Sequence, residues 1–271
     1  METKIKQYGS IVLNIPHSST NIPEHFMPED YGSSKAFYAE RYRLLSRPLV
    51  DYYTDELFDA NEMRITKVTS DICRTLCDVE RMVNDPLEAE GYGIIYKRML
   101  CRRMACGGAG SHVVFKSEFF DPTCKELLEY YVRYQFKLID AIINSAYKND
   151  RDKSVLLIDC HSFSSTPTAL CDPGSQENQV DICIGYNDDA TYPNQNVIDF
   201  IVKYFESFGY KVGCNTPFSH SKTVECPIPY YSSLMIEVNK RCYMNEETLD
   251  KTEGFYRLQH LLQNLYYKIL V

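Results

Sequence analysis

Long apolar segments are missing from this sequence, which narrows the class of protein. No run of apolar residues in the 271-residue chain approaches the ~18 that span a bilayer. The N-terminal residues METKIKQYGS also contain no apolar segment of the kind that directs secretion. We therefore expect a cytoplasmic protein without a membrane partner.

Positive charge is also too scarce for a nucleic-acid-binding protein. The chain has 29 Lys and Arg against 37 Asp and Glu, which gives a formal net charge of −8 and a pI near 5.3. Proteins that bind nucleic acids neutralise phosphates with a basic face. We expect a small-molecule partner and no nucleic acid, and nothing in the sequence indicates an oligomeric state.

Closely paired cysteines are lacking, although the chain contains eleven cysteines. No C-x-x-C pair occurs, and the nearest spacings are Cys73 to Cys77 and Cys101 to Cys106, so a structural zinc ribbon is not predicted. The odd count and the length of the chain argue against a disulfide framework. We expect reduced thiols, most of them buried as small apolar side chains.

What the sequence does contain is a regular succession of short apolar runs. Runs rich in β-branched residues predict strands, and segments with apolar residues at three- and four-residue spacing predict helices. Their alternation predicts an α/β fold with a mostly parallel mixed sheet and helices on both faces. The expected strands are 11–15, 65–69, 155–159, 182–185, 210–215 and 233–239, and the expected helices are 125–147, 193–208 and 248–270. Asp121-Pro122 is expected to start the first of these helices.

One domain suffices for this chain. At 44% hydrophobic side chains, 271 residues can bury one large core, so we predict a single α/β domain over residues 1–271. Residues 88–117 are less regular and contain a cluster of Gly107, Gly108 and Gly110. That cluster predicts a lid or excursion from the domain.

Polar residues mark the ends of three expected strands. His17 follows the first strand, His161 follows the central one, and Glu237 lies in the last. Ligands of open α/β sheets bind outside the carboxyl ends of the strands, so parallel neighbours would bring these groups to one edge. Two imidazoles, one carboxylate and an open position form an arrangement with which zinc activates water. The pattern predicts one zinc ion, with His17 and His161 as ligands.

The third zinc ligand is expected from the helix after the first strand, because that helix begins at the same edge. The candidates are Asp51, Asp55 and Glu56, of which Asp51 lies nearest the helix start. Asp159 lies two residues before His161, so on an extended strand both side chains point to the same side. Asp159 is therefore expected to orient that imidazole.

A carboxylate and two arginines complete the expected chemistry. Glu237 lies in an otherwise apolar strand, where an unpaired charge is costly, so we expect it in a polar pocket as general base and then general acid. Arg74 and Arg81 flank Asp78 after the second strand, and guanidinium groups suit bidentate capture of a substrate carboxylate. Salt bridges to Asp78 or Glu80 are the alternative role for both arginines.

Several short motifs follow one another in a fixed order. They are Pro16-His17-Ser18, Asp51, Arg74 with Asp78 and Arg81, Asp159-Cys160-His161-Ser162, Asn215 with Phe218, and Glu237 with Tyr243-Met244. Spread over about residues 11 to 250, this ordered set resembles the N-formylglutamate amidohydrolase family.

The resemblance implies a zinc-peptidase-like, phosphorylase/hydrolase-like fold. It implies hydrolysis of an N-acyl amide, such as N-formyl-L-glutamate to glutamate and formate. It favours Asp51 over Asp55 as the third ligand, and it implies that Asn215 and Ser162 join the arginines at the substrate.

Differences from the family pattern keep other functions open. Cys124 replaces a family histidine, Ser219-His220-Ser221 replaces a paired glycine, and Lys240 stands where an arginine is expected. A non-catalytic metal- or ligand-binding homologue is one alternative, and a zinc peptidase or amidase with a different amide substrate is another. A Cys160 or Ser162 nucleophile beside His161 is disfavoured, because strand neighbours point to opposite faces and no G-x-S-x-G elbow exists.

Overall fold

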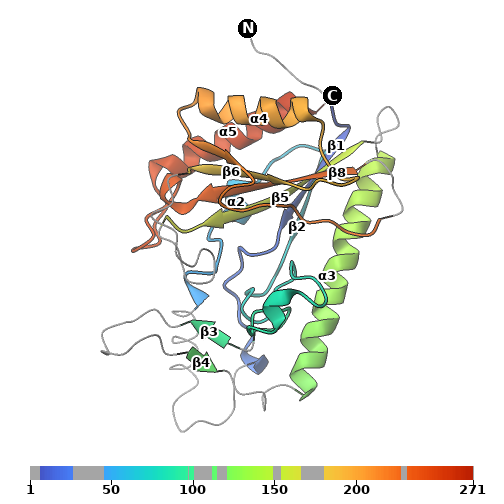
Figure 1. Ribbon diagram of the computed structural model, residues 1–271, viewed down its shortest axis with the longest axis vertical. Coiled ribbons are helices and arrows are strands. Elements are labelled where there is room, and N and C mark those ends of the chain that lie inside the picture. Colours follow the sequence, from blue (N-terminus) through green and yellow to red (C-terminus); the bar gives the residue numbers. More distant parts are fainter. Residues whose placement is uncertain are drawn as a thin grey trace. The chain divides into compact units, whose positions relative to one another are not determined.

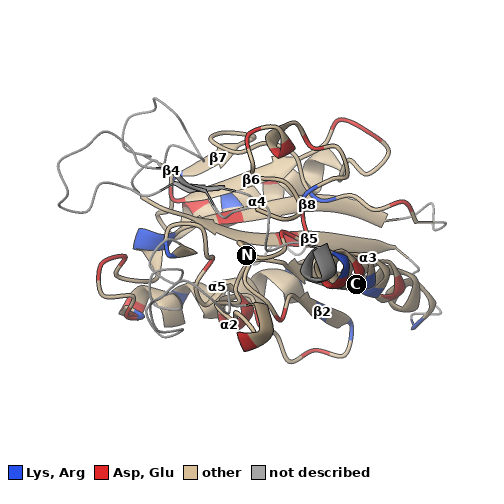
Figure 2. Cartoon of the chain, turned by 90° about the horizontal axis from the view of Figure 1, so that it is seen from below, with Lys and Arg blue, Asp and Glu red and all other residues tan. Residues whose placement is uncertain are grey.

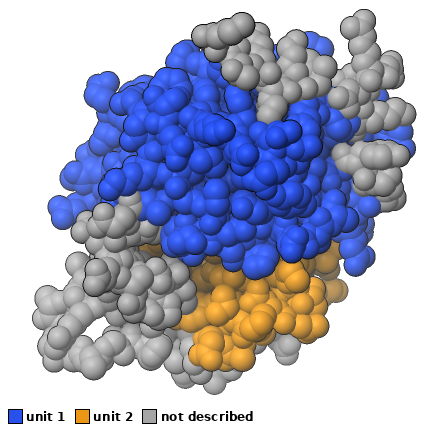
Figure 3. Space-filling model, turned by 45° about the horizontal axis from the view of Figure 1, so that its top comes forward, with its two compact units in different colours: residues 1–15, 51–69, 136–271 blue, residues 16–50, 70–135 orange. Residues whose placement is uncertain are grey.

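The computed structural model describes residues 7–26, 46–96, 98–100, 112–114, 121–148, 154–165, 180–226 and 231–270. The chain forms two compact units, each built from separate stretches of sequence (Figure 3). Unit 1 comprises residues 1–15, 51–69 and 136–271, and unit 2 comprises residues 16–50 and 70–135.

A six-stranded mixed sheet forms the centre of unit 1 (Figure 1). The strand order is β2-β1-β5-β8-β6-β7, in which the first four strands are parallel, β6 is antiparallel to β8, and β7 is parallel to β6. The predicted α/β fold with a mostly parallel mixed sheet is therefore confirmed. The strands are β1 (Ser10–Ile15), β2 (Ile65–Thr69), β5 (Val155–Phe163), β6 (Ile182–Tyr186), β7 (Val212–Cys214) and β8 (Tyr231–Asn239).

Two amphipathic helices cover one face of this sheet, α4 (Gln195–Ser207) and α5 (Glu253–Ile269) (Figure 1). Gly209, with φ of 87°, follows α4 and ends it as predicted, since glycine adopts this left-handed conformation without strain. The alternate strand residues that face the helices are apolar and bury the main core of unit 1. Its fully buried members include Ile11, Leu13, Ile158, Ile184, Ile201, Ile236, Leu258 and Leu262.

The prediction that the last helix begins near residue 248 was wrong, because α5 begins at Glu253. The side chain of Asn245 accepts hydrogen bonds from the backbone N–H groups of Glu247 and Thr248, at 2.8 and 3.1 Å. Leu249 then takes a φ of 65°. A side chain that bonds to nearby backbone groups favours a turn over a helix, and a left-handed residue ends any helical path.

The opposite face of the sheet contacts the last part of α3 (Asp121–Lys148), whose residues from 136 onward belong to unit 1. The hydroxyl of Ser10 on β1 donates to the carbonyl of Ser145 at 3.0 Å. The hydroxyl of Thr66 on β2 lies 3.2 Å from the hydroxyl of Ser145. Helices therefore contact both faces of the sheet, as predicted. Toward the carboxyl ends of the strands this face becomes polar.

Unit 2 consists of loops and short elements beside the first part of α3. It contains 3₁₀ turns at Glu24–Phe26 and Pro86–Glu88 and an antiparallel pair, β3 (Arg98–Leu100) with β4 (His112–Val114). Half of the expected lid at 88–117, with its glycine cluster, lies outside the described residues, and so does the side chain of Cys124. Helix α3 begins at Asp121, where Asp121-Pro122 predicted its start.

Charged residues of both signs are interspersed over the described elements, as along α3 (Figure 2). Among the helices that the structure describes, none has both the length and the apolar character to cross a membrane.

Candidate metal and catalytic site

His161 in unit 1 lies between two buried carboxylates. The period of strand β5 places His161 and Asp159 on the polar face, because side chains two residues apart share a face. The imidazole Nε2 lies 3.1 Å from Asp159 Oδ1, and Nδ1 lies 3.1 Å from Asp51 Oδ2. His161 is only 4% exposed. Asp159 thus lies where orientation of the imidazole requires it.

Asp51 reaches the imidazole from a tight turn and not from a helix. Helix α2 (Thr54–Leu57) is only four residues long, and Asp51 precedes it. The Asp51 carbonyl accepts from the backbone N–H and the hydroxyl of Thr54, at 3.2 and 2.9 Å. Glu56, another expected candidate, is exposed and pairs with Lys251 at 2.5 Å. Asp55 is half-buried, and its backbone carbonyl accepts from a lysine ammonium.

Glu237 lies on the same polar face, in strand β8. Its register neighbours are His161 on β5 and Cys183 on β6. Burial, and to a lesser degree the negative charge of Glu237, raises the pKa of the Cys183 thiol to about 11. The pairing of β8 with β5 therefore places the half-buried carboxylate of Glu237 beside His161, the candidate metal ligand.

Tyr243 lies among the carboxylates at the end of the sheet. Its hydroxyl donates to the Tyr52 carbonyl at 2.8 Å. Ser162, the residue after His161 on β5, is buried as well. Burial raises the pKa of Tyr243 well above its usual value, and the negative charges of Asp51 and Glu237 add to the rise. Tyr243 therefore stays neutral and acts as a donor, a role that its motif in the sequence does not reveal.

Other predicted residues of unit 1 have structural contacts. Asn215 accepts from the backbone N–H of Tyr186 at 2.9 Å, which ties the end of β7 to β6. Cys160 is fully buried in the apolar core, and burial raises its thiol pKa well above the usual value. A nucleophilic cysteine requires an accessible thiolate, so this geometry argues against that alternative.

His17 in unit 2 has an environment similar to that of His161. It follows β1, is 1% exposed, and its Nε2 lies 2.8 Å from Oδ1 of Asp78. Its Nδ1 lies 3.6 Å from Oε2 of Glu80. The sequence indicates Glu80 only as an arginine partner, whereas its place two residues after Asp78 brings both carboxylates near one imidazole.

Asp78 is a fully buried acceptor for several donors of unit 2. Arg74 Nη2 and the Tyr96 hydroxyl each lie 2.9 Å from Oδ2, and Arg81 Nε lies 3.5 Å away. Burial alone would raise the pKa of Asp78, but the guanidinium charges of Arg74 and Arg81 and the hydrogen bond with His17 outweigh it and lower the pKa well below its usual range. Both arginines therefore contact Asp78, and the sequence did not reveal Tyr96.

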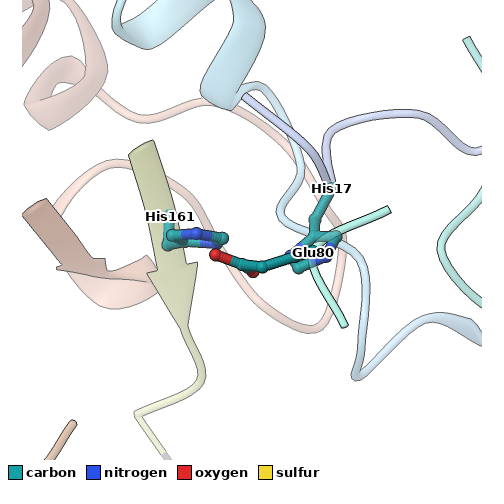
Figure 4. A group of neighbouring side chains, drawn as sticks. All are labelled: His17, Glu80 and His161. Atoms are coloured by element: carbon teal, nitrogen blue, oxygen red, sulfur yellow. The ribbon is translucent and has the colours of Figure 1, made fainter. Parts of the chain in front are cut away.

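The donor atoms suit a metal such as zinc. Tetrahedral zinc with bonds of about 2.0–2.1 Å places its ligand atoms roughly 3.3 Å apart. Nδ1 of His161 lies 3.1 Å from Oδ2 of Asp51, and Nδ1 of His17 lies 3.6 Å from Oε2 of Glu80. Both distances are close to that separation. In addition, each Nε2 faces a buried aspartate, which is the usual second partner of a metal-binding histidine. His17, Glu80 and His161 each offer one ligand atom (Figure 4).

Comparison with known proteins adds independent information. The family model of N-formylglutamate amidohydrolase matches residues 9–244. The crystal structure of N-formylglutamate amidohydrolase from Ralstonia eutropha JMP134 has a similar fold, with a TM-score of 0.70 and 21% sequence identity over 97% of this chain and 93% of that chain. No curated protein sequence matches this chain.

Proposed function

Because this chain belongs to the N-formylglutamate amidohydrolase family, we propose that it is a zinc-dependent hydrolase of N-acyl amino acids. Its substrate resembles N-formylglutamate, and its products are the free amino acid and a carboxylic acid. The observation that carries the proposal is the pair of buried histidines, each with one nitrogen on a buried aspartate and the other near a further carboxylate. A histidine buried only for packing does not need two acidic neighbours.

One zinc ion is held by His17, Asp51 and His161 in this proposal. The close approach of Asp51 Oδ2 to Nδ1 of His161, at 3.1 Å, supports Asp51 as the carboxylate ligand. Glu80 is the competing candidate, since its Oε2 lies 3.6 Å from Nδ1 of His17. Zinc titration of Asp51→Asn and Glu80→Gln distinguishes them, because loss of a direct ligand weakens binding far more than loss of a neighbour.

When bound, zinc would polarise the acyl carbonyl and lower the pKa of a water molecule. Glu237 accepts a proton from the attacking water and passes it to the leaving nitrogen as the C–O bond forms and the C–N bond breaks. Its half-buried position beside His161 in the sheet supports this role.

Arg74 and Arg81 anchor the substrate carboxylate in this proposal, and Ser162 and Asn215 are further substrate-binding residues. A guanidinium offers five N–H donors, so an arginine that already contacts Asp78 retains donors for a second acceptor. The substrate is a small molecule, and we place the enzyme in the cytoplasm.

Metal content tests the proposal most directly. We expect about one zinc per chain by plasma mass spectrometry in the wild type, lost in both His17→Ala and His161→Ala. His25→Ala is the matched control, because the His25 side chain is 59% exposed and its Nε2 lies 3.1 Å from the exposed carboxylate of Glu126. Absence of zinc after reconstitution and washing would refute the metal site and favour a non-catalytic ligand-binding homologue.

A substrate screen then tests the reaction. N-formyl and other N-acyl amino acids would be compared with short peptides, which are the substrates of a peptidase. We expect Glu237→Gln to keep its zinc and lose at least a hundredfold in turnover, in line with the size of general acid–base effects. Glu206→Gln, on the exposed side of α4, is the control. Full activity of Glu237→Gln would remove Glu237 from the mechanism.

A further inference from the structure

Asn14 on strand β1 is a fully buried polar residue to which the proposed reaction assigns no role. It lies on the polar face of the sheet, and its register partner on β5 is Asp159. The Asn14 amide donates from Nδ2 to Oδ1 of Asp159 at 2.7 Å. Because an ionised carboxylate only accepts hydrogen bonds, the NH₂ group and not the oxygen of Asn14 must face it.

The same oxygen of Asp159 also faces His161. Oδ1 lies 2.7 Å from Asn14 Nδ2 and 3.1 Å from His161 Nε2, while Oδ2 accepts from the backbone N–H of Lys222 at 2.9 Å. With one donor on each oxygen, the carboxylate cannot rotate about its Cβ–Cγ bond. The second lone pair of Oδ1 is thereby directed at Nε2.

The Lys222 donor is held firmly by its own segment. The side-chain amide of Asn187 bonds to both backbone groups of Ser221. It accepts from the N–H at 3.2 Å and donates to the carbonyl at 3.1 Å. The Lys222 carbonyl accepts from the hydroxyl of Ser233 at 2.7 Å. Since Lys222 donates to Asp159 through its backbone, side-chain substitution does not remove this contact, and Asn14 is the donor that can be changed.

His161 has an acceptor on each side, and only one can take its proton. A neutral imidazole, the form that binds a metal, carries a single N–H. If the proton is on Nε2, it bonds to Asp159 and Nδ1 presents its lone pair toward Asp51. If it is on Nδ1, the N–H bonds to Asp51 and the lone pair faces Asp159 instead.

From this geometry we infer that Asn14 is a positioning residue. By fixing the Asp159 carboxylate, it keeps the proton of His161 on Nε2 and leaves Nδ1 to ligate the metal. The inference rests on the proposed metal site and assigns Asn14 no contact with substrate. Loss of a partner that orients a metal ligand weakens metal binding roughly 10- to 100-fold. Since Asn14 acts through Asp159, the lower end of about tenfold is expected.

The test uses the full chain with Asn14→Leu, which keeps the length of the side chain and removes the donor. Asn14→Ser is the second variant, in case leucine prevents folding, because its hydroxyl is too short to reach Asp159. Ser10→Ala is the matched control, since it removes a buried hydrogen bond of the same strand, from Ser10 to the Ser145 carbonyl, without touching Asp159.

Two readouts separate positioning from simple loss of stability. In the metal-free protein, at a pH high enough for the His161 ring to be neutral, ¹⁵N ring shifts report which nitrogen carries the proton, with the signals identified by their absence in His161→Ala. The zinc dissociation constant is measured by competition with a chelator. We expect the fraction of His161 that is protonated on Nε2 to be smaller in the Asn14 variants than in Ser10→Ala. We also expect these variants to bind zinc about tenfold more weakly than Ser10→Ala does.

The inference is overturned if folded Asn14 variants keep both the wild-type tautomer and the wild-type zinc affinity, or if the proton moves further toward Nε2. If the wild type itself binds no zinc, the proposed function fails. In that case the tautomer measurement still decides whether Asn14 orients His161, so the two failures are distinguishable.

Discussion

Replacing Asp78 by asparagine tests whether this carboxylate holds unit 2 together. Asp78 is fully buried and faces His17, Arg74 and Tyr96 at 2.8–2.9 Å. Asparagine keeps one acceptor oxygen but places an NH₂ group where an oxygen had accepted bonds. The partly buried Arg74 and Arg81 then lose their counter-charge. Removal of one partner from a buried ion pair costs about 3–5 kcal/mol, because the remaining charge is left uncompensated.

This cost is measurable by urea unfolding of the metal-free protein. Domains of this kind have a free energy of unfolding of about 5–15 kcal/mol, so Asp78→Asn should remove a large share of it. The variant should then unfold at a clearly lower urea concentration than the wild type. Asp140→Asn, on the exposed side of α3, is the control and should stay within about 0.5 kcal/mol of the wild type. A loss below about 1 kcal/mol for Asp78→Asn would refute the reasoning, since it would mean that the arginines do not depend on this carboxylate.

Three further predictions follow from other contacts. Tyr96→Phe removes a hydrogen bond to the buried aspartate of unit 2 and should cost about 1.5–3 kcal/mol in urea unfolding, and an unchanged midpoint would contradict that bond. Gly185→Ala would place a Cβ 2.3 Å from the His220 carbonyl oxygen, so overpacking should cost about 1–3 kcal/mol in the same measurement. Iodoacetamide near neutral pH should modify the exposed Cys214 and spare Cys160, whose burial raises its thiol pKa; peptide mass mapping checks this, and early modification of Cys160 would restore it as a candidate nucleophile.

The central strands and the sheet type were predictable because their signals are local. Each strand is a short β-branched run between turn residues, and the two-residue period alone placed Asp159 beside His161. The antiparallel direction of β6 was not specified, since a strand carries the same pattern in either direction. The start of α5 was predicted too early because the side chain of Asn245 favours a turn.

The contacts of the candidate site were harder to predict because they join distant residues. Asn14 and Asp159 are 145 positions apart in sequence and meet through the pairing of β1 with β5. Arg74 and Arg81 carry the same local signal whether they bind a substrate or a buried aspartate, so the sequence left both roles open. Tyr96 had no motif, and only its hydrogen bond to Asp78 reveals it.

The alternation along β5 makes this strand sensitive to the parity of any change in length. Cys160 faces the apolar core, while Asp159 and His161 face the polar side. Insertion or deletion of one residue before this segment within the strand would exchange the two faces and bury the Asp159 carboxylate and the His161 imidazole in the apolar core. A change of two residues would keep each side chain on its face, but it would shift His161 relative to its register partners on the neighbouring strands. Natural or engineered length variation is therefore expected in the connecting loops and not within β5.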